Sequence, residues 1–129
     1  MGELNEIAVA LLATVTGIDA TSTGSTVLYT VPPGKSLVVT RVVVRCTSFT
    51  AGSKAQEAVA SFGANSATYD DYLNTVTYTV DAANKAIHAS VLDSAVPVYG
   101  AGDEFRVIIE TGSDADVETW AVDVFGYLV

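Results

Sequence analysis

The chain is poor in the residues that most often carry catalysis or lock a small fold. Its 129 residues include one cysteine, one histidine, one tryptophan and three prolines, and six basic residues stand against fifteen acidic ones, for a formal charge of −9. Because Cys46 is alone, no intramolecular disulfide can form, which suits a reducing compartment. No stretch approaches the roughly 18 consecutive apolar residues of a membrane-spanning helix. So acidic a surface also repels nucleic-acid phosphates and anionic lipid, so neither nucleic acid nor membrane is an expected partner.

The opening residues predict no cleaved secretory signal. Glu3 and Glu6 stand where such a signal carries Lys or Arg, and the first basic residue is Lys35.

The chain is rich in short β-type runs separated by turn residues. Two such runs, 27–31 and 36–46, flank Pro32-Pro33-Gly34-Lys35, in which Pro fixes φ and Gly accepts the positive φ of a chain reversal. Similar runs follow downstream, with turn signals at intervals of roughly 8 to 15 residues. This pattern predicts an all-β, jelly-roll-like β-sandwich of about seven or eight antiparallel strands. The immunoglobulin version lacks its Cys, Trp, Cys arrangement.

Alternation predicts which side chains face the core. The expected inward faces are Val27, Tyr29 and Val31; Val38, Thr40, Val42, Val44 and Cys46; Ala58, Ala60 and Phe62; Val76, Tyr78 and Val80; Ile87, Ala89 and Val91; Phe105, Val107 and Ile109; and Trp120, Val122, Val124 and Leu128.

Residues 1–16 are expected to form an extended N-terminal arm or a first strand, and residues 17–129 a single β-sandwich domain. The arm shows apolar alternation at Ile7, Val9, Leu11, Ala13 and Val15. A free arm of this kind buries its apolar side chains only against a neighbour, for instance by adding a strand to the edge of the neighbour's sheet.

Nothing in the sequence indicates an enzyme or a cofactor. His88 would need Ser90 and an acid such as Asp93 around it to form a triad, and no Gly-x-Ser-x-Gly elbow accompanies it. Cys46 ends an apolar alternation, which favours a buried, unreactive thiol.

The acidic residues supply one weak metal candidate. Asp114, Asp116 and Glu118 lie at alternate positions, so an extended chain would place three carboxylates on one side, where they could hold Ca²⁺. The Gly and distal Glu of an EF-hand loop are missing, so a solvated acidic loop is the default interpretation.

Four aromatic residues surround the Asp70-Asp71 pair: Phe62, Tyr69, Tyr72 and Tyr78. Tyr69 and Tyr72 lie in a polar segment and could anchor a protein interface or stack on sugars. The alternative, that they rim the core, stays open.

Three segments carry a family resemblance: Leu28–Lys35 followed by Val38-Val39-Thr40, Phe62-Gly63-Ala64-Asn65 leading to Tyr69-Asp70-Asp71-Tyr72, and Phe125-Gly126-Tyr127. Roughly from Ala10 to the end, the chain resembles small virion proteins of tailed bacteriophages. The resemblance implies a β-sandwich or jelly-roll module that decorates or cements a capsid, or belongs to a tail or head fibre. It implies a homo-oligomer, with a trimer favoured, that binds the major capsid protein or another virion protein. It also implies assembly in the host cytoplasm, final location in the virion and no catalytic residue.

Three hypotheses follow. The first is a non-enzymatic capsid decoration or cement protein whose contacts with neighbours involve Ile7, Val9, Leu11, Tyr69 and Tyr72. The second is a carbohydrate- or receptor-binding module with Tyr69, Tyr72 and Trp120 as platforms, although alternation predicts that Trp120 faces inward. The third is a small hydrolase that uses Asp70, Asp71 and Asp114.

Overall fold

The computed structural model describes residues 9–91 and 97–129, leaving aside the side chains of residues 87–91. These residues form nine strands and no helix, so the all-β fold is confirmed. The strands are β1 (Ala10–Asp19), β2 (Gly24–Thr30), β3 (Leu37–Thr50), β4 (Ala58–Gly63), β5 (Leu73–Tyr78), β6 (Lys85–Val91), β7 (Val98–Tyr99), β8 (Glu104–Thr111) and β9 (Val117–Leu128).

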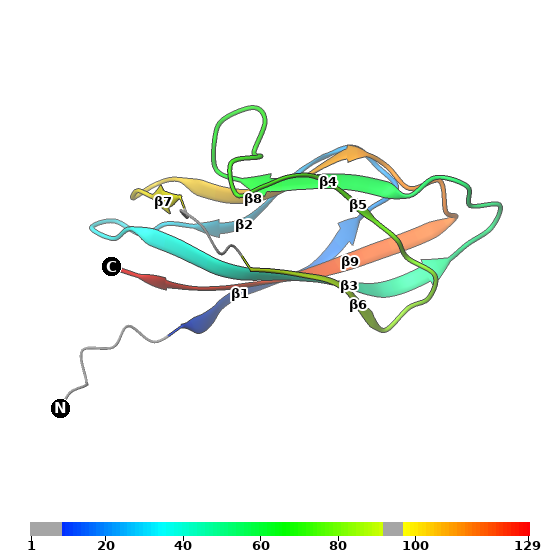
Figure 1. Ribbon diagram of the computed structural model, residues 1–129, viewed down its shortest axis with the longest axis horizontal. Helices are drawn as coiled ribbons and strands as arrows, with labels where there is room; N and C mark the ends of the chain where they lie inside the picture. Colours follow the sequence, from blue (N-terminus) through cyan, green and yellow to red (C-terminus); the bar gives the residue numbers. More distant parts are fainter. Residues whose placement is uncertain (1–8, 92–96) are drawn as a thin grey trace.

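The strands lie in two antiparallel sheets packed face to face (Figure 1). The first sheet has the order β1-β9-β3-β6, with β7 paired to the start of β3, and the second has the order β2-β8-β4-β5. The chain crosses from one sheet to the other after β1, β2, β3, β5, β7 and β8, which gives the double Greek key of a jelly roll. The jelly-roll prediction is therefore confirmed.

The turn at Pro32–Lys35 makes one of these crossings. Lys35 N donates a hydrogen bond to Pro32 O at 3.3 Å, so the chain reverses where the sequence predicts. The two flanking strands do not pair with each other, because β2 pairs with β8 while β3 pairs with β9.

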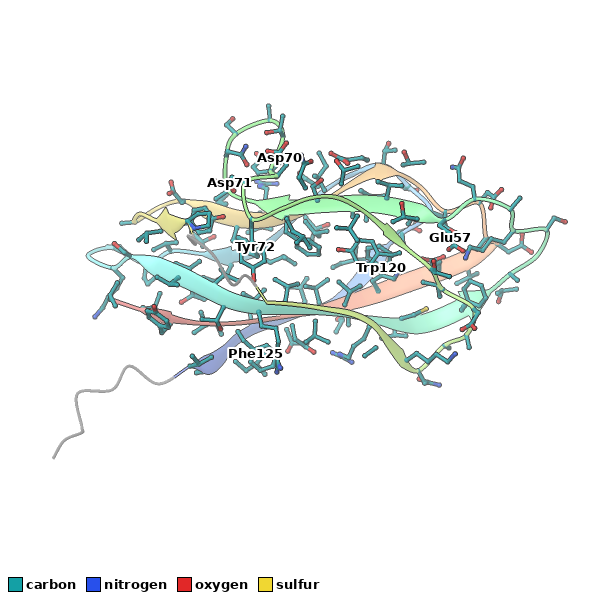
Figure 2. The ribbon with its side chains drawn as sticks, in the orientation of Figure 1. Glu57, Asp70, Asp71, Tyr72, Trp120 and Phe125 are labelled. Atoms are coloured by element: carbon teal, nitrogen blue, oxygen red, sulfur yellow. The ribbon has the colours of Figure 1, made fainter. Side chains whose placement is uncertain are left out.

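Aromatic side chains fill the space between the sheets. Tyr78 packs edge-on against Trp120 with ring centroids 5.0 Å apart, and Tyr72 packs edge-on against Phe105 at 5.5 Å. Tyr72 and Trp120 both lie between the two layers (Figure 2). Edge-to-face pairs of this kind add specific attraction to the apolar area that they bury.

Of the two alternatives predicted for the N-terminal residues, an arm or a first strand, the structure shows a strand from Ala10 onward. Ala10–Asp19 pairs along β9 of its own chain, so the expected boundary at residue 16 falls inside β1. The expected alternation of Val9, Leu11, Ala13 and Val15 is also wrong. Leu11 is 53% exposed, whereas Leu12 and Val15 pack against the core. β-Bulges between Leu11 and Ala13 and between Val15 and Ile18 cause the change of face.

Bulges change the predicted faces of β2 and β3 as well. In β2, Leu28 is buried and Tyr29 is only half-buried, with a shift between Val27 and Tyr29. In β3 the bulge between Val39 and Arg41 leaves Val38 and Thr40 half-buried.

The faces predicted for most later positions are correct. Buried as expected are Val42, Val44, Cys46, Ala58, Ala60, Phe62, Tyr78, Val80, Phe105, Val107, Ile109, Trp120, Val122 and Val124. The predicted inward side chains of Ile87, Ala89 and Val91 lie outside the described residues.

Candidate interaction surface

An open groove lies on the outer side of the first sheet. It has a volume of about 300 Å³ and is lined by Val9, Thr40, Arg41 and Phe125, which come from the start of β1, from β3 and from β9. Phe125 points away from the second sheet (Figure 2). Leu11 pairs directly with Phe125 across β1 and β9, so its side chain lies on the same outer face.

The bulge in β3 builds the polar wall of this groove. The extra residue between Val39 and Arg41 lets both Thr40 and Arg41 reach it. Thr40 Oγ1 donates to Phe125 O at 3.2 Å, and the Arg41 guanidinium carbon lies 4.7 Å from the Phe125 ring centroid. The groove therefore presents an aromatic ring covered on one side by a cation.

A second arginine on the same sheet is paired. Arg45 Nε and Nη2 donate to the two carboxylate oxygens of Asp123 at 2.9 and 3.1 Å, and Thr14 Oγ1 donates to Asp123 Oδ1 at 2.8 Å. Burial opposes ionisation of Asp123, but the hydrogen bonds from Arg45 and Thr14 outweigh it and lower the pKa. The charge of Arg45 is therefore balanced by Asp123, whereas Arg41 lies over the Phe125 ring.

Two of the predicted interface residues lie at this groove. Val9 is 55% exposed and Leu11 is 53% exposed. Isolated exposed aliphatic residues are common, but here two of them adjoin an aromatic groove. Ile7, the third predicted member, lies outside the described residues.

The segment 63–72, between β4 and β5, rises from the second sheet as a loop (Figures 1 and 2). Asn65 Oδ1 accepts hydrogen bonds from Asp70 N at 2.8 Å and Asp71 N at 3.2 Å. Asn65 Nδ2 and Thr68 Oγ1 donate to Asp70 Oδ1 at 2.7 and 3.0 Å, and these bonds, Asn65 first, lower the pKa of Asp70. The network holds Tyr69 at a φ of 46°, a conformation that non-glycine residues rarely adopt.

Asp71 ties the base of this loop to the core. Its Oδ1 accepts from Ala64 N at 3.0 Å and from the hydroxyl of Tyr99 at 2.9 Å. A Cβ at Gly63 would lie 2.2 Å from Asp71 Oδ1, so only glycine allows this close approach.

The two tyrosines proposed for the interface lie in different environments. Tyr72 is 4% exposed and packs on Phe105, so the interface role predicted for it is wrong: its ring anchors the loop in the core. Burial raises the pKa of the Tyr72 hydroxyl to about 12. Tyr69 is half-buried, with the Arg106 guanidinium carbon 5.2 Å from its ring centroid.

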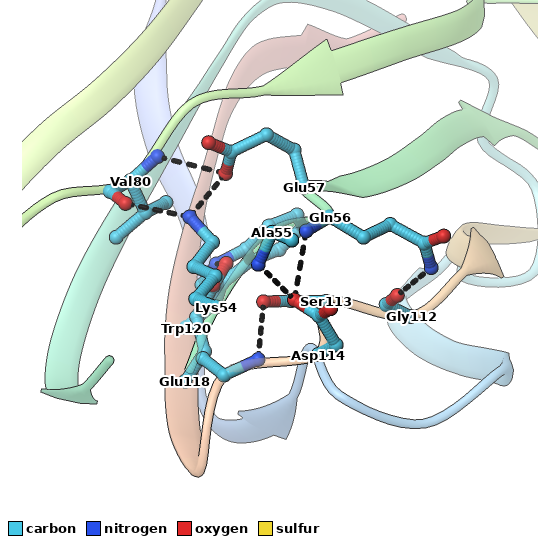
Figure 3. Close-up of polar contacts among 11 residues, drawn as sticks. Lys54, Ala55, Gln56, Glu57, Val80, Gly112, Ser113, Asp114, Glu118 and Trp120 are labelled. Carbon is cyan, nitrogen blue, oxygen red and sulfur yellow. Dashed lines mark hydrogen bonds and ion pairs between the residues drawn. The ribbon is translucent and has the colours of Figure 1, made fainter. Parts of the chain in front are cut away.

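The predicted calcium ligands do not converge. Asp114 is exposed and its Oδ1 accepts from Ala55 N at 2.9 Å and Gln56 N at 2.8 Å, whereas Glu118 is 1% exposed and accepts from Trp120 Nε1 at 2.9 Å (Figure 3). Asp116 and Val117 are both exposed, which breaks the alternation and turns Glu118 inward. No group of His, Cys, Asp and Glu among the described residues is arranged to hold a metal ion.

Lys54 is the most enclosed cation among the described ion pairs. Its side chain is 8% exposed, forms an ion pair with Glu57 and donates to Val80 O at 2.7 Å (Figure 3). Glu57 Oε1 also accepts from Val80 N at 3.2 Å. These contacts fasten the β3–β4 loop to the segment that follows β5.

Among residues 9–86 and 97–129, the side chains considered for catalysis show no shared site. Cys46 is buried, and desolvation, the largest effect, raises the pKa of its thiol. The carboxylates of Asp70, Asp71 and Asp114 each accept local hydrogen bonds, and Asp114 binds a different loop from the other two. The side chains of His88 and Ser90, and Asp93 as a whole, lie outside the described residues.

Sequence reasoning missed Arg41 and Phe125 as a pair. Phe125 belongs to the family-like motif, but nothing local relates it to a residue far away in the chain. Only the pairing of β3 with β9, and the bulge in that ladder, brings the two together.

The chain matches no protein-family model, no curated protein and no solved structure. Within residues 9–91 and 97–129 there is no helix of the length and apolar character needed to cross a membrane. A functional proposal therefore depends on this geometry together with the sequence resemblance to phage virion proteins.

Proposed function

We propose that this protein is a non-enzymatic structural protein of a tailed-phage virion, which decorates or cements the capsid. The jelly-roll topology supports this proposal, since the fold is common in viral capsid proteins. Jelly rolls also occur in lectins and cupins, so the choice depends on the surface rather than on the fold.

The observation that carries the proposal is the outward-facing groove around Phe125, with Val9 and Leu11 exposed beside it. Aromatic residues and Arg are enriched where proteins meet, and an apolar patch next to a cation is typical of such contacts. The carboxylates considered for catalysis are instead occupied with local hydrogen bonds.

The proposed partners are the major capsid protein, or another virion protein, and further copies of this chain. The resemblance to phage proteins favours a trimer. The proposed location is the virion, after assembly in the host cytoplasm, and the lone buried thiol of Cys46 is compatible with that compartment.

The carbohydrate-binding alternative keeps only one of its three rings at the surface. Trp120 is fully buried and Tyr72 is nearly so, while Tyr69 is half-buried beside Arg106. A stacking platform needs an open ring face. The interface role is therefore favoured.

Co-sedimentation with empty shells of the virus that encodes this chain tests the proposal. Purified protein is expected to pellet with the shells in a fixed ratio to the major capsid protein. Leu11→Asp is expected to reduce binding, because it puts a carboxylate on an apolar contact. Val98→Asp is the matched control, since Val98 is 63% exposed and lies on β7. Absence of shell binding by the wild-type protein, together with hits on a glycan array, would refute the structural role.

A further inference from the structure

We propose that the groove lined by Val9, Thr40, Arg41 and Phe125 receives residues 1–8 from a second copy of this chain. The inference rests on the proposed function and deepens it, because it names the contact by which neighbouring copies hold each other on a shell. Residues 1–8 read Met-Gly-Glu-Leu-Asn-Glu-Ile-Ala and lie outside the described part of the chain.

The place where the described chain starts is the first argument. Val9 lines the groove itself, so the preceding residues start at its rim. Eight extended residues reach at most about 28 Å, which spans several strands at their usual spacing of roughly 4.8 Å. The segment is long enough to cross to the groove of an adjacent copy.

Local sequence favours a neighbouring groove over the chain's own. To enter its own groove, the chain would have to reverse immediately before Val9. Residues 6–9 read Glu-Ile-Ala-Val and contain none of the Gly, Pro, Asn, Asp or Ser residues that favour a tight reversal. The proposal therefore assigns the segment to the groove of another copy.

Charge gives the second argument. Two chains of formal charge −9 repel each other over most of their surfaces, but the groove carries the cation of Arg41, for which no ion pair with a carboxylate is found among the described residues. The segment supplies the opposite charge at Glu3 and Glu6. A carboxylate that reaches Arg41 gains a charge-assisted hydrogen bond.

Apolar residues in the segment match the rest of the groove. In an extended chain Glu3 and Ile7 share one face, and Leu4 and Glu6 share the other. Either face therefore presents one carboxylate and one branched aliphatic side chain. Arg41 and the Phe125 ring offer the complementary pair of contacts.

The first test compares the molar mass of the full chain with that of a variant lacking residues 2–8, using light scattering. All nine described strands begin at or after Ala10, so the variant retains every described backbone pairing, which circular dichroism checks. The full chain is expected to be an oligomer and the shortened chain a monomer. Reciprocal exchange gives a dimer and cyclic exchange a trimer, and either supports the inference. A monomeric full chain, or an oligomer that survives the deletion, overturns it.

The second test measures binding of a fluorescent peptide of residues 1–9 to the shortened protein by anisotropy. Arg41→Glu is expected to weaken binding about tenfold or more. A peptide carrying Glu3→Lys and Glu6→Lys is expected to regain affinity for the Arg41→Glu protein. Lys85→Glu is the matched control, because Lys85 is exposed and lies at the start of β6. The inference is overturned if Arg41→Glu and Lys85→Glu weaken peptide binding equally, or if the peptide does not bind the shortened protein.

Shell binding separates this inference from the proposed function. If the full chain and the shortened chain are both monomers, and the shortened chain still co-sediments with shells, exchange is rejected and the decoration role is retained. A full chain that exchanges its segment without binding shells supports exchange and rejects that role.

Discussion

Gly126 lies on β9 where the backbone of β3 leaves no room for a side chain. A Cβ at this position would lie 2.1 Å from Val38 O and 3.1 Å from Val39 Cα, both backbone atoms that cannot rotate away. Gly126→Ala is therefore expected to push β3 and β9 apart and to lower the free energy of unfolding by about 1–3 kcal/mol. Urea denaturation measures the change.

Gly100→Ala is the matched control for this substitution. The nearest atom to a Cβ at Gly100 is Asp103 Oδ2, 3.9 Å away, which is ordinary contact. The expected change is within about 0.5 kcal/mol. Similar losses for the two variants would show that crowding at Val38 is not the cause.

Lys54 forms a largely enclosed ion pair and Lys85 forms an exposed one. The Lys54 side chain is 8% exposed and also donates to Val80 O, whereas Lys85 and its partner Asp81 are 54% and 75% exposed. Lys54→Ala is expected to cost about 2 kcal/mol, because it removes a donor from partly enclosed acceptors. Lys85→Ala is expected to cost about 0.5 kcal/mol or less. Thermal or urea unfolding measures the loss of stability in each variant. Equal losses would show that the contacts of the enclosed Lys54 stabilise the fold no more than those of Lys85.

At the scale of an element, a side-chain hydrogen bond ties the loop 63–72 to β7. The Tyr99 hydroxyl donates to Asp71 Oδ1 at 2.9 Å, and Tyr99 is 4% exposed. Asp71→Ala leaves this hydroxyl without its acceptor, at an expected cost of about 1–3 kcal/mol. Asp71→Asn keeps an acceptor oxygen and should cost less.

A double-mutant cycle isolates this hydrogen bond. In a Tyr99→Phe background the hydroxyl is gone, so Asp71→Ala should cost less than in the wild type, by about 1 kcal/mol. Both measurements use urea denaturation at neutral pH. Simple additivity of the two changes would show that the hydrogen bond contributes nothing.

The elements also show how far sequence alone can lead. Alternation in β4, β8 and β9 predicts their buried faces correctly, because the bulges in their ladders insert the extra residue into the partner strand or, in β8, after the buried Ile109. It fails in β1, β2 and the first half of β3, where bulges insert a residue and exchange the two faces. A bulge is a property of two paired strands, so a single strand's sequence does not reveal it.

The candidate site shows the same limit. The sequence predicts that Val9 and Leu11 stay uncovered by their own chain, and both are exposed, but it does not show that Leu12 and Val15 pack against the core. Arg41 lies beside Phe125 only through the ladder between β3 and β9. The burial of Tyr72 and Glu118 likewise depends on partners far away in the sequence.

At the scale of the whole molecule, the carboxylates determine how stability depends on pH. Hydrogen bonds lower the pKa values of five aspartates. The main donors are Thr21 for Asp19, Asn65 for Asp70, Lys85 for Asp81 and the Gln56 amide for Asp114. For Asp123, burial alone would raise the pKa, but hydrogen bonds from Arg45 and Thr14 outweigh it. Unfolded Asp titrates near about 3.9, above each folded value. These groups therefore stabilise the fold fully above that pH. Below it the unfolded state binds more protons, so stability is lost as the pH falls through the folded values.

At neutral pH the net charge destabilises the fold, whereas the hydrogen-bonded carboxylates stabilise it. A formal charge of −9 produces self-repulsion in the folded state, which salt screens over roughly 10 Å at 0.1 M. Raising NaCl from about 0.02 M to about 0.5 M is therefore expected to increase the free energy of unfolding at pH 7. Near the isoelectric point, about pH 4.2, repulsion is minimal and the same salt step should have little effect. Urea denaturation at the two pH values measures both, since urea is uncharged. A salt effect of equal size at both pH values would mean that ion-specific solvation, rather than the surplus of carboxylates, controls the stability of this jelly roll.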